Sequence, residues 1–175
     1  MTSRIVHLGL GSNQGDRAAH LRAAVRAIAA WPEVDTLDVS PVYETAHVGT
    51  EPAPPYLNVC VALHGGPAAD EILRRAQHLE RDAGRPDDGH MRPRPLDVDL
   101  LLDGAARRSD ARLTLPHPRL RERRFVLQPL YDLDPSLTIP GESRSLAALL
   151  EREDVARQPI ERVEIELGSG CEDDA

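Results

Sequence analysis

The spacing of apolar residues predicts four strands and two helices in the first 104 positions of the chain. Short apolar or alternating runs indicate strands at residues 4–13, 34–46, 56–65 and 96–104. A helical period of apolar residues indicates helices at residues 16–31 and 69–83. Asp16 is placed to cap the first helix, and Gly84 is placed to end the second.

Alternation within the strands predicts which side chains share a face. The residues expected on one side are Leu37, Val39 and Tyr43 in the 34–46 strand, Leu57, Val59, Val61 and Leu63 in the 56–65 strand, and Val98, Leu100 and Leu102 in the 96–104 strand. The apolar stripes of the two helices are formed by Leu21, Val25 and Ile28 and by Ile72, Leu73, Ala76 and Leu79. These residues are the candidate core.

The predicted order is strand, helix, strand, strand, helix, strand. No helix separates the second predicted strand from the third, and a plain loop favours antiparallel pairing. This order is typical of a ferredoxin-like α+β sandwich, in which helices cover one face of a mostly antiparallel sheet. The pattern then predicts extra C-terminal elements: a short strand near Leu113, helices around 119–132 and 145–151, and a last strand at 162–167. We expect one domain over residues 1–166 and a disordered acidic tail at 167–175.

Composition narrows the class of protein. The 175-residue chain has a formal net charge of -8 at pH 7, which argues against a general nucleic-acid binder. No apolar run approaches the roughly 20 residues of a membrane span, and the first residues lack the pattern of a secretory signal. Cys60 and Cys171 lie far apart, without metal-ligand spacing. We therefore expect a reduced, cytoplasmic protein that binds neither nucleic acid nor membrane.

Two aspartates interrupt the apolar strand in the segment RPRPLDVDLLLDG. Asp97 and Asp99 should project from the same face, with their Cα atoms about 6–7 Å apart. Two adjacent carboxylates repel each other unless a cation neutralises them, and Mg²⁺ prefers oxygen ligands that it shares with substrate phosphates. An exposed strand face without a metal is the alternative reading of this pattern.

Arginines gather on both sides of this pair, and all 21 basic residues of the chain are arginine. The flanking arginines are Arg85, Arg92 and Arg94 before the pair and Arg112, Arg119, Arg121, Arg123 and Arg124 after it. Guanidinium groups bind phosphate in a bidentate manner, so an acidic protein with such clusters is suited to a small polyanion. A solvated helix face is the alternative.

Tyr56 and Asn58 lie one residue apart on the predicted 56–65 strand, so they should share a face. An aromatic ring beside a carboxamide suits a flat heterocycle, through stacking and hydrogen bonds to its edge. Core packing of the tyrosine and a strand-end role for the asparagine remain open on this pattern alone.

Five segments together resemble the 6-hydroxymethyl-7,8-dihydropterin pyrophosphokinase family of folate biosynthesis. They are GLGSNQGD, PYLNVCVAL, LERDAGR, PRPLDVDLLLDG and LTLPHPRLRERRFVLQPL, in the family's order over residues 5–135. The resemblance implies a ferredoxin-like fold and transfer of pyrophosphate from ATP to the hydroxymethyl group of the dihydropterin, with release of AMP. It also implies a cytoplasmic monomer whose partners are these two small molecules.

The resemblance also assigns residues to roles. Asp97 and Asp99 would hold two Mg²⁺ ions, and Arg85 and Arg94 would complete the catalytic set. The pterin would be bound by Thr45, Tyr56, Asn58 and Phe125. ATP would be bound by Gln77, Glu80, Arg85, Arg94, Leu100, Arg112, Thr114, His117 and Arg123.

The chain departs from the family pattern in the loop before the aspartates. Met91 and Arg92 stand where the family usually has tryptophan and glycine, which predicts an altered affinity for ATP or a slower closure of this loop. Two other functions stay open on the residues: a different Mg²⁺-dependent nucleotide transferase, and a non-catalytic small-molecule sensing domain of the same fold.

Overall fold

The computed structural model describes residues 4–46, 52–84 and 94–168. Its central sheet runs in the order β5-β1-β4-β3-β8, and β2 also pairs with β4. These strands are β1 (Ile5–Ser12), β2 (Val34–Val39), β3 (Val42–Thr45), β4 (Tyr56–Gly65), β5 (Asp97–Asp103) and β8 (Glu161–Val163). Every pairing among them is antiparallel, which confirms the predicted α+β sheet.

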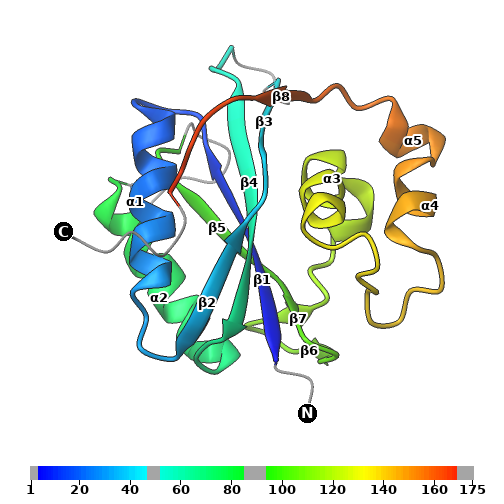
Figure 1. Ribbon diagram of the computed structural model, residues 1–175, viewed down its shortest axis with the longest axis horizontal. Coiled ribbons are helices and arrows are strands. Elements are labelled where there is room, and N and C mark those ends of the chain that lie inside the picture. Colours follow the sequence, from blue (N-terminus) through cyan, green and yellow to red (C-terminus); the bar gives the residue numbers. More distant parts are fainter. Residues whose placement is uncertain (1–3, 47–51, 85–93, 169–175) are drawn as a thin grey trace.

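Helices α1 (Arg17–Ala29) and α2 (Ala69–Asp82) cover one face of the sheet, as predicted (Figure 1). The other face carries α3 (Arg124–Leu133), which is followed by α4 (Leu146–Leu150) and α5 (Glu153–Ala156). A short hairpin of β6 (Arg108–Ser109) and β7 (Thr114–Leu115) and a 3₁₀ turn, η1 (Leu120–Glu122), lead from β5 to α3. The predicted C-terminal helices therefore exist and form a second layer.

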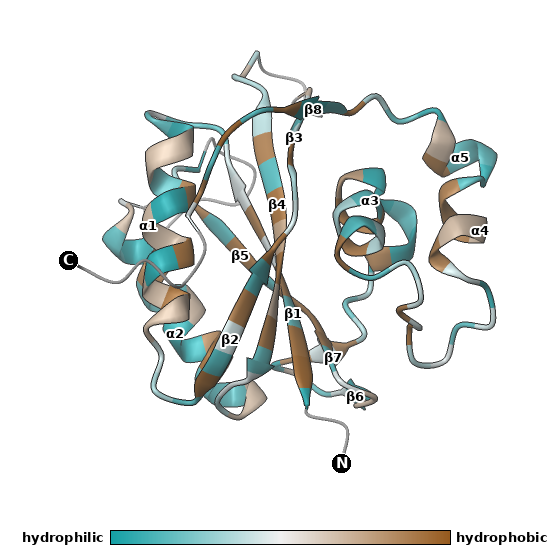
Figure 2. Cartoon of the chain, in the orientation of Figure 1, coloured by the Kyte–Doolittle hydropathy of each residue, from teal (hydrophilic) through white to brown (hydrophobic). Residues whose placement is uncertain are grey.

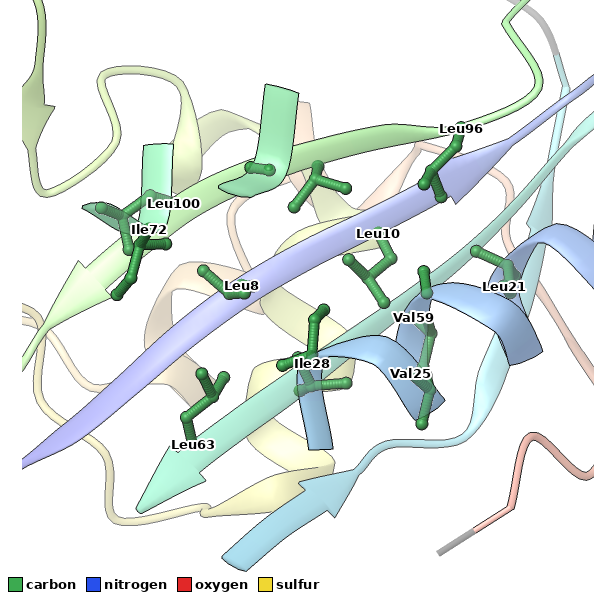
Figure 3. Packing of buried hydrophobic residues seen from close by; sticks show 14 of the residues in the cluster. Leu8, Leu10, Leu21, Val25, Ile28, Val59, Leu63, Ile72, Leu96 and Leu100 are labelled. Atoms are coloured by element: carbon green, nitrogen blue, oxygen red, sulfur yellow. The ribbon is translucent and has the colours of Figure 1, made fainter. Parts of the chain in front are cut away.

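Each face of the sheet has its own core. The first core lies under α1 and α2, where Figure 3 shows Val25 and Ile28 beside Val59 and Leu63 of β4. The second core lies under α3 and includes Cys60, Leu101, Leu127 and Leu130. Figure 2 shows that the hydrophobic stretches run along the central strands, between the two helical layers. The predicted alternation of β4 is confirmed, since its odd-numbered residues 57–63 enter the first core and Cys60 enters the second.

The ends of α1 and α2 follow local signals. Asp16 accepts a hydrogen bond from the backbone N–H of Ala19 at 3.0 Å, as expected of a residue that caps a helix N-terminus. Gly84 follows α2 with a φ of +93°, a left-handed conformation that glycine adopts without a steric penalty.

The predicted single strand at 34–46 is wrong, because it is two strands separated by Ser40 and Pro41. Proline has no N–H to donate to a ladder, and Ser40 instead bonds Cys60 of β4 through both its backbone N–H and its hydroxyl. Because of the break, side chains that regular alternation would place on one face of the sheet lie on opposite faces. Leu37 and Val39 pack against the first core, whereas the hydroxyl of Tyr43 reaches α3 on the other face.

The alternation of β5 is also broken near its end. Leu8 of β1 pairs with Leu100, but His7 pairs with Leu102, so Leu101 is an extra residue in a β-bulge. Leu102 therefore packs in the second core, and the prediction that it shares a face with Val98 and Leu100 is wrong.

Two further observations bear on the expected organisation. Within the described residues, no helix is both long and apolar enough to cross a bilayer. Most of the acidic tail expected at 167–175 lies outside the described residues, which end at Gly168.

Candidate functional site

Two cavities meet at β5, the strand at the edge of the sheet. The first has a volume of about 630 Å³ and reaches from the aspartates to β3, β4 and α3. The second has a volume of about 580 Å³ and extends toward α2. Both are lined by the same four charged residues, Arg94, Asp97, Asp99 and Arg123. A molecule in one cavity would therefore lie beside a molecule in the other, with the charged group between them.

Residues that are paired across β5, β1 and β4 form the floor of the first cavity. Asp97 of β5 pairs with Gly11 of β1, which in turn pairs with Asn58 of β4. Residues paired across neighbouring strands point to the same face, so the glycine leaves a hollow between a carboxylate and a carboxamide. A Cβ at Gly11 would lie 3.3 Å from Oδ1 of Asn58. The GLGSN segment therefore keeps this floor open.

Asp97 and Asp99 both face these cavities, as their alternation predicts. Asp97 forms an ion pair with Arg94, with 3.1 Å between Oδ1 and Nη1, and Asp99 lies 4.0 Å from Nη1 of Arg123. Burial, followed by the negative charge of Asp97, raises the pKa of Asp99 to about 6. The two neighbouring arginines therefore do not fully neutralise the negative charge of the two carboxylates.

This pair of carboxylates fits a hard divalent cation. Carboxylate oxygens are the ligands that Mg²⁺ prefers, and Mg²⁺ commonly takes only one or two of them from the protein. Across the described ranges, no group of three or more His, Cys, Asp or Glu side chains is arranged to hold a metal. The other ligands would have to come from water and from a bound phosphate.

The first cavity also holds the four residues expected to contact a flat heterocycle. Thr45, Tyr56, Asn58 and Phe125 all line it. Asn58 is 7% exposed, and its Nδ2 donates to Oγ1 of Thr45 at 2.9 Å, which fixes the orientation of the carboxamide. Burial, followed by the charge of Asp97, raises the pKa of Tyr56. The geometry suits a planar molecule that uses both aromatic contacts and hydrogen bonds at its edge.

The second cavity is more polar and includes Gln77, Glu80 and His117. Glu80 is buried, and its Oε1 accepts a hydrogen bond from the backbone N–H of Val98 at 2.9 Å, so it also holds α2 against β5. Burial, followed by the charge of Arg123, lowers the pKa of His117. Because Arg94 and Arg123 are in its lining, this cavity suits an anionic ligand.

Three predicted ATP-contact residues do not line these cavities. Leu100 is 4% exposed and packs in the first core. Arg112 and Thr114 lie in or beside the β6–β7 hairpin and line neither of the two cavities as described. Arg85 lies outside the described residues, as do Met91 and Arg92.

The cavities also include residues that the sequence did not single out for this role. They are Gly9, Leu10, Gly11, Val59, Cys60, Leu101, Glu122, Val126, Gln158, Pro159 and Ile160 in the first cavity and Leu73, Ala76, Arg81 and Val98 in the second. Arg119 lines the first cavity and belongs to the arginine cluster noted from the sequence. The segment at 158–160 carries no signal of its own, because only the path of the chain brings it here.

The family model described as 7,8-dihydro-6-hydroxymethylpterin-pyrophosphokinase (HPPK) matches residues 7–135. Relatives named 2-amino-4-hydroxy-6-hydroxymethyldihydropteridine pyrophosphokinase include one from Methylorubrum extorquens, 38% identical over 152 residues, which covers 86% of this chain and 96% of the relative. Another, from Bacillus subtilis, is 37% identical over 131 residues and covers 75% of this chain and 78% of the relative.

Solved structures agree on the fold. The Plasmodium falciparum HPPK-DHPS A437G structure superposes with a TM-score of 0.64 at 11% identity and covers 85% of this chain. The matched region is 45% of the length of that longer protein. At this identity the likeness supports the arrangement of helices and strands.

Proposed function

Because the chain belongs to the 7,8-dihydro-6-hydroxymethylpterin-pyrophosphokinase family, we propose that it transfers pyrophosphate from ATP to the hydroxymethyl group of 6-hydroxymethyl-7,8-dihydropterin, with Mg²⁺, and releases AMP. The reaction belongs to folate biosynthesis. The observation that carries this proposal is the junction of two unlike cavities at Asp97 and Asp99. One cavity suits a flat heterocycle and the other a polyanion.

The pterin is assigned to the first cavity. Tyr56 and Phe125 would contact the faces of its ring, and Asn58, oriented by Thr45, would bond its edge. ATP is assigned to the second cavity, where Gln77, Glu80 and His117 lie near the two arginines. The further ATP contacts expected from the family are Leu100, Arg112 and Thr114, which line neither described cavity, and Arg85, which lies outside the described residues.

Asp97 and Asp99 would hold two Mg²⁺ ions, which would offset the negative charge of the triphosphate. In the reaction, the hydroxymethyl oxygen bonds to the β-phosphorus as the bond from the β-phosphorus to the oxygen bridging it to the α-phosphate breaks. AMP leaves with that oxygen, and the hydroxyl proton passes to water. Arg94 and Arg123 would steady the phosphates. Catalysis of this kind rests on positioning and electrostatics, so it requires no protein nucleophile.

The direct test is incubation of the protein with ATP, Mg²⁺ and 6-hydroxymethyl-7,8-dihydropterin, followed by chromatography. We expect equal amounts of AMP and pyrophosphorylated pterin, and no product when EDTA replaces Mg²⁺. Release of pyrophosphate with a nucleotidylated acceptor would instead identify a nucleotidyl transferase. Binding of both ligands without turnover would identify a sensing domain.

We also propose that the protein acts as a cytoplasmic monomer. The net charge of -8 supports small-molecule rather than nucleic-acid partners. Size-exclusion chromatography with light scattering tests the oligomeric state, and a stable dimer would contradict this part of the proposal.

A further inference from the structure

A C-terminal segment reaches the first cavity from outside the region that the family model matches. Gln158, Pro159 and Ile160 line this cavity, whereas the family match ends at residue 135. Figure 1 shows the chain leaving α5, passing the end of α3 and arriving at β8. β8 then pairs with β3, the strand that carries Thr45. The segment is therefore held between a helix and the sheet.

Gln158 binds the start of α3 through both atoms of its carboxamide. Its Oε1 accepts from the backbone N–H of Arg124 at 2.9 Å, and its Nε2 donates to the carbonyl oxygen of Glu122 at 2.6 Å. Arg124 returns the contact, because its Nη1 donates to the carbonyl oxygens of Ala156 and Gln158 at 3.0 and 2.9 Å. These bonds join two segments that are 34 residues apart.

This contact supplies a cap that the helix itself lacks. The first N–H groups of a helix have no partner within the helix. Among the described residues, the side chain of Arg123, the N-cap residue of α3, makes no capping hydrogen bond. Gln158 thus satisfies an N–H that would otherwise depend on water.

The capped turn carries two residues of the site. Arg123 and Phe125 flank Arg124, and both line the first cavity. Their side chains also contact each other, with the guanidinium of Arg123 5.5 Å from the centre of the Phe125 ring. A shift of the backbone at Arg124 would move both.

We propose that residues 158–160 form a wall of the pterin cavity, in which Gln158 is a positioning residue for Arg123 and Phe125 and Ile160 contacts the heterocycle directly. Ile160 is half-buried and supplies apolar surface at the cavity. The inference rests on the proposed function, because it assigns a further part of the same pterin site.

Two variants test the inference. Ile160→Ala removes apolar contact and should weaken pterin binding about 5-fold. Gln158→Ala should raise the KM for the pterin about 10-fold and also lower kcat, because it disturbs Arg123 beside Asp99. The affinity of Ile160→Ala for ATP should not change. Titration with the pterin, titration with ATP and steady-state kinetics give these values.

Gln128→Ala is the matched control. Gln128 is a glutamine on α3 itself, where its Nε2 donates to Oδ1 of Asp132, and it lines neither described cavity of the site. It should keep the wild-type KM and kcat. If wild type turns over and both test variants match this control, the inference is overturned. If wild type does not bind or convert the pterin, the proposed function fails instead. Should Gln158→Ala fail to fold, the Ile160→Ala result decides.

Discussion

The Tyr43 hydroxyl of β3 donates a hydrogen bond to Oδ2 of Asp132 on α3, across 2.5 Å. Burial, followed by this bond and the charge of Asp132, raises the pKa of Tyr43 to about 12. β3 also carries Thr45, and α3 also carries Phe125. The bond therefore joins β3 and α3, each of which carries a residue that lines the first cavity.

Tyr43→Phe should lower the free energy of unfolding by about 1–2 kcal/mol, because Oδ2 of Asp132 loses its part-buried bond to Tyr43, while Gln128 still donates to Oδ1. Urea denaturation followed by circular dichroism measures the change. Tyr131→Phe is the control, since Tyr131 is half-buried on the same helix. Equal effects of the two substitutions would show that the Tyr43–Asp132 bond adds no stability.

Asp97→Asn and Asp99→Asn should each reduce turnover by about 100-fold or more, because each removes a carboxylate that, under the proposed function, would hold Mg²⁺ beside the phosphates. Neither should unfold the protein. Asp99→Asn should be at least as stable as wild type in the absence of Mg²⁺, since it removes a disfavoured charge beside Asp97. Coupled AMP assays and thermal denaturation measure both properties.

Asp103→Asn is the contrasting variant on the same strand. Asp103 is in neither cavity of the site and forms an ion pair with Arg4, with 2.6 Å between Oδ1 and Nε. We expect it to keep its turnover and to lose stability. Mg²⁺-dependent activity retained in both Asp97→Asn and Asp99→Asn would rule out the two-metal assignment.

Tyr56→Ala and Phe125→Ala should weaken pterin binding about 10- to 100-fold, because a stacking contact with a base is worth about 1–3 kcal/mol. The affinity for ATP should change much less, since neither residue lines the second described cavity. Calorimetric titration with each ligand separately measures the difference. Similar losses for both ligands would place these aromatic residues elsewhere in the mechanism.

The burial of His7 leads us to expect that the protein is less stable in acid. His7 is 4% exposed, and within the described residues its Nδ1 has no hydrogen-bond partner. Burial is the main cause that lowers its pKa to about 4; Asp134 opposes the shift, and His64 adds to it. His7 lines a further cavity of about 850 Å³, and Arg4, Asp38 and Asp103 line it as well.

The direction in which the free energy of unfolding changes with pH follows from the linkage between proton binding and folding. A histidine whose pKa is lower in the folded state takes up its proton more readily when unfolded. The free energy of unfolding should therefore fall, by up to about 3 kcal/mol, as the pH drops from about 6.5 to about 4. His7→Gln should flatten this dependence in urea titrations. His78→Gln, at an exposed position on α2, should leave it intact, and a wild-type slope in His7→Gln would exclude His7 as its source.

Much of the fold is local in origin and was predictable. The alternation of β4 and the helical period of α1 and α2 report burial directly, because one face of each element must meet the core. The same rule places Asp97 and Asp99 on one face of β5. Asn58 and Tyr56 follow in the same way on β4.

Other features required contacts between distant segments. Pro41 signals a break, but pairing with Cys60 decides that both halves stay in the sheet. The bulge at Leu101 depends on the register with β1, and alternation within β5 alone contradicts it. The helical pattern alone indicates that Glu80 is exposed. In the structure, its carboxylate instead accepts a hydrogen bond from the backbone of β5.

The sequence by itself determined which side chains share a strand face or a helix face, since those periods depend only on backbone geometry. It also determined the family, through the order of its motifs. The tertiary structure alone decided that two cavities meet at Asp97 and Asp99 and that Gln158 caps α3. Such contacts join residues far apart in the chain, and their geometry is set by how whole elements pack rather than by any local pattern.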